Sequence, residues 1–525
     1  MNFKEKLTNR LKKQLKQDIV LNIPPSIEFG DYSLHCFNLN PEEIRKKIKS
    51  NLIEKIEIKG PYLNIFINKN KFIEETLKEI KKDYGNSNLG NNKKLLIEHT
   101  SINPNAAPHV GRARNAIIGD SLSRILRFNK YKIEVHYFVN DVGKQISMLV
   151  LAAGNKKPKF NELLKLYIKI NKDLEKNPEL ENKVFDLLNK LEKGDKVIKK
   201  KFKEIVDICL KGQVKILSDL GIKYNFFDYE SKYLWNNQAN EILKKLEKTG
   251  KVFIDEHGRK ILDLKEFNLN VMVLTRKDGT SLYQLRDLAY TIEKLSKTPK
   301  NIILLGEDHK LYFQQLKKAL SLMNQKAPEV IHYSFILLKE GKMSTRQGNI
   351  VLLQDFMKES LEKASNELKK RKNYSEKLAK AIGYGALKFQ ILKVSSEKNI
   401  IFDWDQALSF EGETCPYVQY TNARINSILK KSKPSHKIDY NKFNQEEFTL
   451  IKKLSEFPEI VKESALKYKP NLICNYLIQL CQLFNNYYSR YEIKSSKERL
   501  FLASKLKQII TTGLFLLGME APESM

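Results

Sequence analysis

The segment from Leu95 to Val139 constrains the fold more than any other part of this chain, because it reads as strand, helix, strand. LLIEHT, which begins at Leu95, is a short apolar run typical of a buried strand. Val110 to Phe128 carries apolar residues at helical spacing on one face, and Ile133 to Val139 alternates apolar and polar residues. Parallel strands need a crossover connection of this length, so the pattern predicts a parallel βαβ unit.

Three further apolar runs continue the α/β pattern: VMVLT, NIILLG and VIHYSFILL, between residues 271 and 338. The stretch from about 151 to 224 is rich in Lys, Glu and Leu at helical spacing, which predicts a helical insertion. We therefore expect an α/β Rossmann-type catalytic domain with a parallel sheet over residues 93–400.

The two flanking regions have different patterns. Residues 1–85 combine helical stretches with IEKIEI and YLNIFI, two alternating runs separated by Lys-Gly-Pro, which predicts a hairpin in a small α+β domain. Residues 405–525 lack strand signals, and we expect an all-α domain there. A chain of 525 residues exceeds what one core usually fills, so several domains are expected.

The net charge of +31 favours a polyanionic partner, and nucleic acid fits better than a membrane surface. A biased genome that enriches Lys, Asn and Ile produces the same excess, so the charge alone leaves both explanations open. The five cysteines have no CxxC pair, which argues against a disulfide framework or a Cys-rich zinc site. No apolar run is long enough to span a bilayer, and the start is a poor signal peptide, so we expect an intracellular protein without membrane contact.

The stretch NAAPHVGRARN, residues 105–115, stands where the helix of the βαβ unit begins. In open α/β sheets, ligands lie beyond the carboxyl ends of strands, where helix N-termini offer unpaired N–H groups and a positive dipole end. Gly111 lets a nucleotide approach the backbone, His109 offers a donor to a phosphate oxygen, and Arg112 or Arg114 adds charge. An ordinary helix start, with proline in its first turn and arginines in water, accounts for the same residues.

A second basic loop, KMSTRQGN (residues 342–349), follows the last apolar run of the α/β region. Its lysine, serine and arginine suit a clamp over a polyphosphate, because cations and hydroxyls stabilise charge that develops on a leaving group. A solvated loop is the alternative for this segment alone. Together, one in each half of a doubly wound sheet, the two motifs resemble the HIGH and KMSKS signatures of class I aminoacyl-tRNA synthetases.

Longer stretches resemble one branch of that class, the arginyl-tRNA synthetases: EHTSINPNAAPHVGRARNAIIGDSLSRIL, VNDVGKQ, SLYQLRDLAY, PYVQYTNARINSIL, FGDYSL, IKGPYLNIFI and LGMEAPESM. The resemblance implies an arginine–tRNA ligase that activates L-arginine with ATP, releases pyrophosphate, and transfers the arginyl group to the terminal adenosine of tRNA-Arg. It also implies a tRNA-contacting N-terminal domain and an anticodon-binding C-terminal domain. Further implications are Mg²⁺ on the phosphates, no protein-bound metal, a cytoplasmic monomer, and arginine activation that requires bound tRNA.

Residue roles follow from these motif matches. The residues implied for ATP are Pro108, His109, Gly111, Arg112, Lys342, Met343 and Ser344. The catalytic set among them is His109, Gly111, Lys342 and Ser344. The residues implied for arginine are Glu98, Ser101, Asn103, His109, Tyr283, Asp287 and His309, with a weaker candidate in Glu230. The residues implied for tRNA, which alternatively pack the core of the helical domain, are Tyr417, Gln419, Tyr420, Asn422 and Arg424.

Two of these positions also carry a geometric argument. Tyr283 and Asp287 are four residues apart, so one helical face presents both to a planar guanidinium. The alternative is an exposed ion pair between Arg286 and Asp287. Arg112 stands where the HIGH signature has its second histidine, and the sequence leaves open whether it binds phosphate, touches tRNA or faces water. Thr345 replaces the second lysine of KMSKS, with Arg346 following.

Three rival functions explain part of the pattern. Another class I synthetase, for lysine, cysteine or glutamate, shares both signatures, but Tyr283 with Asp287 disfavours an acidic substrate and the cysteine ligands are absent. A tRNA-binding protein that lost catalysis through Arg112 is opposed by the intact Lys342, Ser344 and Asn103. A small-molecule adenylyltransferase leaves the terminal domains unexplained.

Overall fold

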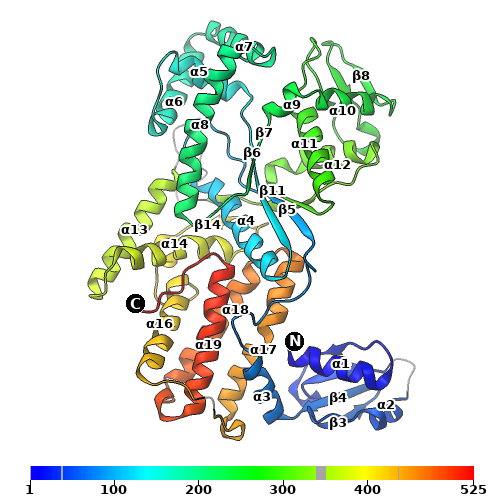
Figure 1. Cartoon of the computed structure of the whole chain (residues 1–525), viewed down its shortest axis with the longest axis vertical. Coiled ribbons are helices and arrows are strands. Elements are labelled where there is room, and N and C mark those ends of the chain that lie inside the picture. Colours follow the sequence, from blue (N-terminus) through cyan, green and yellow to red (C-terminus); the bar gives the residue numbers. More distant parts are fainter. Residues whose placement is uncertain (1, 37–39, 338–350, 436) are drawn as a thin grey trace.

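A five-stranded parallel sheet forms the centre of the molecule (Figure 1). The computed structural model describes residues 2–525 apart from 37–39, 338–350 and 436. The strand order is β12-β11-β5-β6-β7, and every neighbouring pair is parallel. The strands are β5 (Lys94–Glu98), β6 (Lys132–Val139), β7 (Phe226–Tyr229), β11 (Asn301–Gly306) and β12 (Glu329–Tyr333). The predicted Rossmann-type α/β fold is confirmed.

Helix α4 (Val110–Phe128) connects β5 to its parallel neighbour β6, which confirms the βαβ unit. Consecutive residues Leu95, Leu96 and Ile97 of β5 are all fully buried, as expected for a parallel strand covered on both faces. The helix packs closely against the end of this strand. A Cβ atom added at Gly119 would lie 2.2 Å from the His99 ring, so only glycine fits between helix and strand.

Two excursions leave the sheet on opposite sides in Figure 1. The first, between β6 and β7, is the predicted helical insertion, and its first helix begins before the predicted boundary. It contains α5 (Lys144–Ala153), α6 (Phe160–Lys176), α7 (Glu179–Glu192) and α8 (Lys196–Asp219). The second excursion, between β7 and β11, contains α9 (Ser231–Trp235), α10 (Gln238–Glu247), β8 (Val252–Ile254), β9 (Lys260–Leu262), β10 (Met272–Val273) and α11 (Tyr283–Lys297).

The run VMVLT contributes β10, which is not a strand of the parallel sheet. It pairs antiparallel with β9, which in turn pairs antiparallel with β8. A short apolar run looks the same in either kind of sheet, so periodicity alone cannot place it. After β11 the chain forms α12 (Lys310–Leu322) and then β12. The run VIHYSFILL does not form one continuous strand: its first part belongs to β12, and β13 (Ile336–Leu337) is a separate strand.

Helices dominate the rest of the chain, as predicted. They are α13 (Leu353–Lys370), α14 (Glu376–Leu392), α15 (Trp404–Ala407), α16 (Cys415–Lys431), α17 (Gln445–Lys467), α18 (Asn471–Tyr488) and α19 (Lys497–Leu516). The short strand β14 (Ile400–Ile401) pairs parallel with β13. Among the helices of the described residues, none has both the length and the apolar character needed to cross a bilayer.

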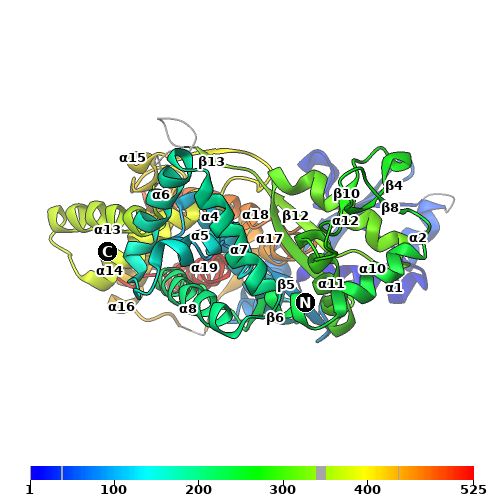
Figure 2. The same ribbon diagram turned by 90° about the horizontal axis from the view of Figure 1, so that it is seen from above.

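The N-terminal region forms a four-stranded antiparallel sheet with the order β1-β2-β4-β3. Its elements are α1 (Phe3–Leu15), β1 (Leu21–Asn22), β2 (Tyr32–His35), α2 (Pro41–Lys47), β3 (Ile53–Lys59), β4 (Tyr62–Ile67) and α3 (Lys69–Glu79). The predicted hairpin is β3-β4. This region contacts the C-terminal helices through the edge-to-face rings of Phe72 and Phe448, whose centres are 5.7 Å apart, and α3 lies beside α17 in Figure 1. Seen from above, α1 and α2 lie on the same side of the molecule as β8 and α10 (Figure 2).

We expect Gly119→Ala to destabilise the catalytic domain by about 1–3 kcal/mol, the usual effect of overpacking a core. Thermal unfolding followed by circular dichroism measures this change as a lower Tm. The double variant with His99→Ala is the control, because residues in contact have non-additive effects, and it should be less destabilised than the two single changes summed. A Tm at or above that of the wild type, as for alanine in an open helix, would contradict the close contact.

Candidate active site

The turn before α4 presents a helix N-terminus at the carboxyl edge of the sheet. β5 ends at Glu98, and the chain then runs to His109, the N-cap residue of α4, whose side chain makes no capping hydrogen bond. In the first helical turn the N–H of Gly111 has no acceptor among the described residues, and a free N–H at a helix N-terminus favours an anion. The carbonyl of Pro108 accepts a hydrogen bond of 2.7 Å from the N–H of Leu353.

His109 is held as a neutral ring at this turn. Its Nδ1 atom is buried without a hydrogen-bond partner. Burial lowers the pKa of His109 to about 4, and the nearby charge of Arg112 acts in the same direction. A buried ring nitrogen without a protein partner can bond to a ligand.

A first cavity of about 200 Å³ opens at this turn. One wall is formed by His109, Gly111 and Arg112 at the start of α4. The other walls come from the end of β11 and from the segment between β12 and β13; they are Gly306, Asp308, Tyr333, Ser334, Phe335 and Ile336. Three of the residues predicted for ATP thus line one cavity at the carboxyl edge of the sheet.

The two arginines of the turn have different environments. The Arg112 guanidinium lines the first cavity and makes no hydrogen bond or ion pair to a described residue. Arg114 is fully buried and donates hydrogen bonds to four backbone carbonyls. The prediction that Arg114 supplies charge to a phosphate is therefore wrong, because its side chain points into the protein.

The predicted clamp residues Lys342, Met343 and Ser344 lie outside the described residues. The chain that follows them is described and lies against the turn. The N–H of Val110 donates to the carbonyl of Val351 over 3.0 Å, and His109 forms an isolated antiparallel bridge with Leu352.

A second cavity, of about 360 Å³, lies between the loop after β6, α7 and the start of α11. Two residues predicted for arginine, Asn103 and Tyr283, line it together with Glu230. The side-chain amide of Asn103 donates a hydrogen bond of 3.1 Å to Gln145, which also lines this cavity.

Asp287 lies one helical turn beyond Tyr283 on α11 and is largely buried. Its carboxylate accepts a hydrogen bond of 2.6 Å from the hydroxyl of Tyr312 and a longer one of 3.4 Å from Thr291. The rings of Tyr283 and Tyr312 lie 5.6 Å apart, so Tyr283 packs beside the tyrosine that donates to the carboxylate. Burial raises the pKa of Asp287, and the charge of Lys294 opposes that effect.

The alternative of an exposed ion pair between Arg286 and Asp287 is wrong. Arg286 is buried, and its Nε atom lies 2.7 Å from a carboxylate oxygen of Glu230, which is 2% exposed. Burial raises the pKa of Glu230 to about 7, while Arg286 opposes the shift. Glu230 thus already has a cation within the protein.

Glu98 has an internal partner as well. It forms a buried ion pair with Lys294, whose ammonium also lies 4.0 Å from the centre of the Tyr290 ring. The hydroxyl of Ser101 donates to the other carboxylate oxygen over 3.5 Å. Lys294 and Tyr312 were missed from sequence. Lys294 follows Asp287 by seven residues, which is a helical spacing that places both on one face.

His309 is not part of the cluster that the other residues form. Its side chain is 46% exposed, lines neither cavity, and lies nearest to the carboxylate of its neighbour Asp308, at 3.7 Å. Its predicted role in facing the arginine stays a prediction.

Two of the residues predicted to contact tRNA are buried. Gln419 is 0% exposed and donates to the carbonyls of Ala381 and Glu520, and Asn422 is 1% exposed and donates to the carbonyl of Pro522. Their amides hold the C-terminal segment, so their assignment as direct tRNA contacts is wrong.

The other three predicted tRNA contacts, Tyr417, Tyr420 and Arg424, are partly exposed. The Arg424 guanidinium lies 4.9 Å from the ring centre of Tyr420 and 4.9 Å from that of Tyr488.

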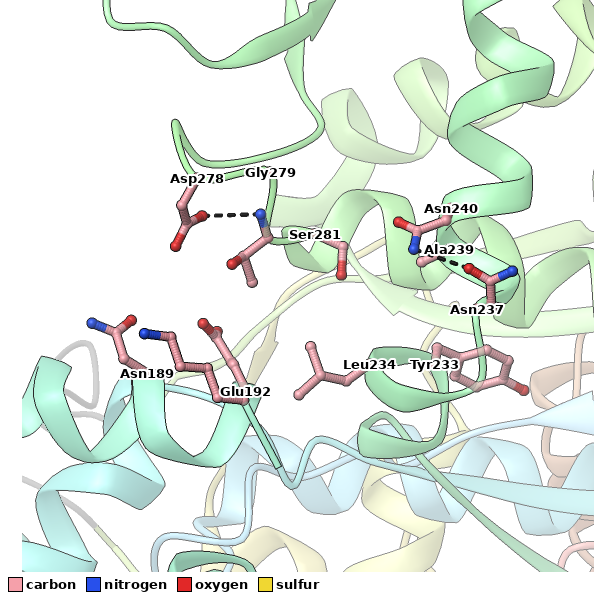
Figure 3. A pocket seen from close by; sticks show the side chains of 12 residues that line it. Asn189, Glu192, Tyr233, Leu234, Asn237, Ala239, Asn240, Asp278, Gly279 and Ser281 are labelled. Atoms are coloured by element: carbon pink, nitrogen blue, oxygen red, sulfur yellow. Dashed lines mark hydrogen bonds between the residues drawn. The ribbon is translucent and has the colours of Figure 1, made fainter. Parts of the chain in front are cut away.

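A third cavity, of about 200 Å³, adjoins the second one through Glu192, which lines both. Figure 3 shows Asp278 and Ser281, from the loop before α11, above Asn189 and Glu192 of α7. The backbone N–H of Thr280 donates to Asp278 over 3.0 Å within this loop, and Arg276 of the same loop forms an ion pair with Glu192 of α7. None of the predicted site residues that the structure describes lines this cavity.

Three family models match the chain. They are described as tRNA synthetases class I (R), catalytic domain, over residues 73–404; DALR anticodon binding domain, over residues 418–525; and arginyl tRNA synthetase N terminal domain, over residues 1–67. Curated arginine–tRNA ligases from Methanocaldococcus jannaschii and Methanosphaera stadtmanae are 40% and 37% identical to it. The alignments cover all of this chain and 100% and 98% of those proteins.

Solved structures resemble the fold over the whole chain. Arginyl-tRNA synthetase from Thermus thermophilus matches with a TM-score of 0.85 at 24% identity, covering 100% of both chains. The enzyme from Plasmodium falciparum matches with a TM-score of 0.80 at 20% identity, covering 99% of both chains. With its parallel sheet, its terminal domains and its full-length similarity to these ligases, the chain belongs to the arginyl-tRNA synthetase family of class I.

Proposed function

We propose that the first cavity binds ATP and the second binds arginine during arginine–tRNA ligation, the reaction of this family. The enzyme is an aminoacyl-tRNA ligase. The carboxylate of arginine attacks the α-phosphorus of ATP and pyrophosphate leaves, which gives arginyl-adenylate. The 2′-hydroxyl of the terminal adenosine of tRNA-Arg then attacks the arginyl carbonyl, and AMP leaves. Neither step needs a covalent intermediate with the protein, so positioning and charge stabilisation carry the catalysis.

In this proposal ATP occupies the first cavity, beside the N-terminus of α4. The N–H of Gly111 and the neutral His109 ring would donate to phosphate oxygens, and the absence of a side chain at Gly111 leaves room for them. Arg112 is the cation that lines this cavity, which supports a role in binding ATP. We assign Lys342 and Ser344 to the departing pyrophosphate, and Met343 to ATP binding, on the motif match alone. Mg²⁺ bound to the phosphate oxygens would offset part of their negative charge.

Arginine would extend from Asn103 and Ser101, which hold its amino-acid backbone groups, past Tyr283 to Asp287. A single observation carries this assignment. Of the three carboxylates Glu98, Glu230 and Asp287, only Asp287 has no ion-pair partner among the described residues. A guanidinium is a planar monocation with several N–H donors, and it pairs best with a carboxylate that is not already neutralised. Tyr312 would orient that carboxylate.

The remaining assignments rest on the family match. Partner molecules would be tRNA-Arg, L-arginine and ATP, and the expected form is a cytoplasmic monomer. The partly exposed Tyr417, Tyr420 and Arg424 stay candidates for tRNA contact, because an arginine placed near aromatic rings suits stacking on unpaired bases.

We expect Asp287→Asn to raise the KM for arginine about 10- to 100-fold, since a hydrogen bond to a charged group contributes about 1.5–3 kcal/mol. The KM for ATP should not change. Citrulline is the uncharged isostere of arginine, and the preference for arginine over citrulline should narrow by a similar factor. Steady-state aminoacylation with saturating tRNA measures both effects.

The matched control for this variant is Glu293→Gln on the same helix, whose carboxylate pairs with Lys232 rather than facing the cluster. It should leave both KM values near those of the wild type. An unchanged arginine KM in Asp287→Asn would remove Asp287 from the site, whereas charging of tRNA with lysine in place of arginine would contradict the substrate assignment.

A second prediction concerns pH. Because burial lowers the pKa of His109 to about 4, its ring is neutral from pH 6 to 8.5 and gains a proton only as the pH falls toward 4. The ratio of kcat in the wild type to kcat in His109→Asn should therefore be constant over that range, and the division cancels the titration of other groups. An imidazole with an ordinary pKa of about 6.5 would instead make the ratio rise about fourfold, and that result would contradict a neutral His109.

A further inference from the structure

The buried Arg114 connects two segments that are far apart in the sequence. Its side chain is 0% exposed and leaves α4 one turn after Gly111. One terminal nitrogen donates to the carbonyls of Ser334 and Phe335, over 2.7 and 3.2 Å. The other donates to the carbonyls of Ser395 and Lys398, over 3.0 and 2.7 Å. The first pair precedes β13 and the second pair precedes β14, the two strands that pair with each other.

This connection joins opposite walls of the first cavity. His109 and Gly111 form one wall from the start of α4, and Ser334 and Phe335 form another. Further hydrogen bonds fix the second wall. The Ser334 hydroxyl lies 2.7 Å from a carboxylate oxygen of Glu307, and the N–H of Ser334 donates to the carbonyl of residue 396 over 2.8 Å. The width of the cavity between the two walls therefore depends on the Arg114 guanidinium.

The chemistry of the contact is unusual for a group that only stabilises the fold. No carboxylate among the described residues is hydrogen-bonded to Arg114, and its Nε atom is buried without a partner. Burial lowers the pKa of the guanidinium to about 10, with Glu307 opposing the shift, so it stays charged at neutral pH. A buried charge held only by carbonyls adds less to stability than apolar packing would, but it sets the positions of four carbonyls at once.

We propose that Arg114 is a positioning residue for ATP: it holds the Ser334–Phe335 wall of the first cavity at the correct distance from the His109–Gly111 turn. It does not touch the substrate, because all of its paired donors are directed at backbone carbonyls. The inference rests on the proposed placing of ATP in the first cavity. It goes beyond the motif match, which assigns no role to this position.

The test compares Arg114→Lys and Arg114→Met with the wild type in aminoacylation at saturating tRNA and arginine. A lysine reaches fewer carbonyls, and misplacement of a binding wall by about 1 Å can change activity by up to about 100-fold. We expect the KM for ATP to rise about tenfold or more in Arg114→Lys and further in Arg114→Met, with the KM for arginine within about twofold of the wild type. A merely structural defect would lower the active fraction, and so kcat, without changing the KM for ATP.

Lys388→Met is the matched control. Lys388 is also buried and also donates to backbone carbonyls, those of Leu220 and Gly518, but these lie outside the first cavity. This variant should lose thermal stability and keep the KM for ATP. An unchanged KM for ATP in a folded Arg114→Lys, or an equal rise in Lys388→Met, would overturn the proposal. The variant Arg112→Ala distinguishes failure of the Arg114 role from failure of the proposed ATP site. If the KM for ATP is unchanged in Arg112→Ala but rises in both Arg114 variants, ATP binds in the first cavity without help from Arg112. If the KM for ATP is unchanged in all three variants, ATP does not bind in this cavity.

Discussion

The close contact between α4 and the end of β5 is the constraint on which the rest of the catalytic domain depends. Gly119 lets the helix approach the His99 ring, and this approach places the N-terminus of α4 at the carboxyl edge of the sheet. The same helix then carries His109 and Gly111 at its start and Arg114 one turn later. Farther along, Ser121 donates to the carbonyl of Leu516, so the anticodon-binding domain is attached to the helix that begins at the first cavity.

Ion pairs within the protein distinguish three acidic residues, Glu98, Glu230 and Asp287, that look equivalent in the sequence. Glu98 pairs with Lys294 and Glu230 with Arg286, and both pairs are buried. Breaking such a pair leaves an uncompensated buried charge, so neither acid can change partners at low cost. Among the described residues, only hydroxyl groups are hydrogen-bonded to the Asp287 carboxylate, so in the proposed site it would accept the guanidinium of a substrate without displacing a cation of these residues.

The spacing of residues along the chain predicted those features of the fold and site that depend on neighbouring residues. The helix from Val110 to Phe128 and the pairing of its two strands followed from periodicity, and the shared face of Tyr283 and Asp287 followed from a spacing of four. Long-range partners could not be predicted this way. Gln419 resembled a base-contacting residue, but its amide holds the C-terminal segment 101 residues away. The predicted Lys342 and Ser344 clamp lies outside the described residues.

The sequence by itself determined the family, the order of the elements and the residue types available for the reaction, because each of these is written in contiguous motifs. Only the tertiary structure decided which charged side chains line a cavity and which are already bound to other parts of the protein. Arg112 and Arg114 are two residues apart in one motif, yet Arg112 lines the first cavity and Arg114 is buried on four carbonyls. The physical reason is helical geometry. Residues two apart point to different sides of a helix, and what covers each side comes from segments more than 200 residues away.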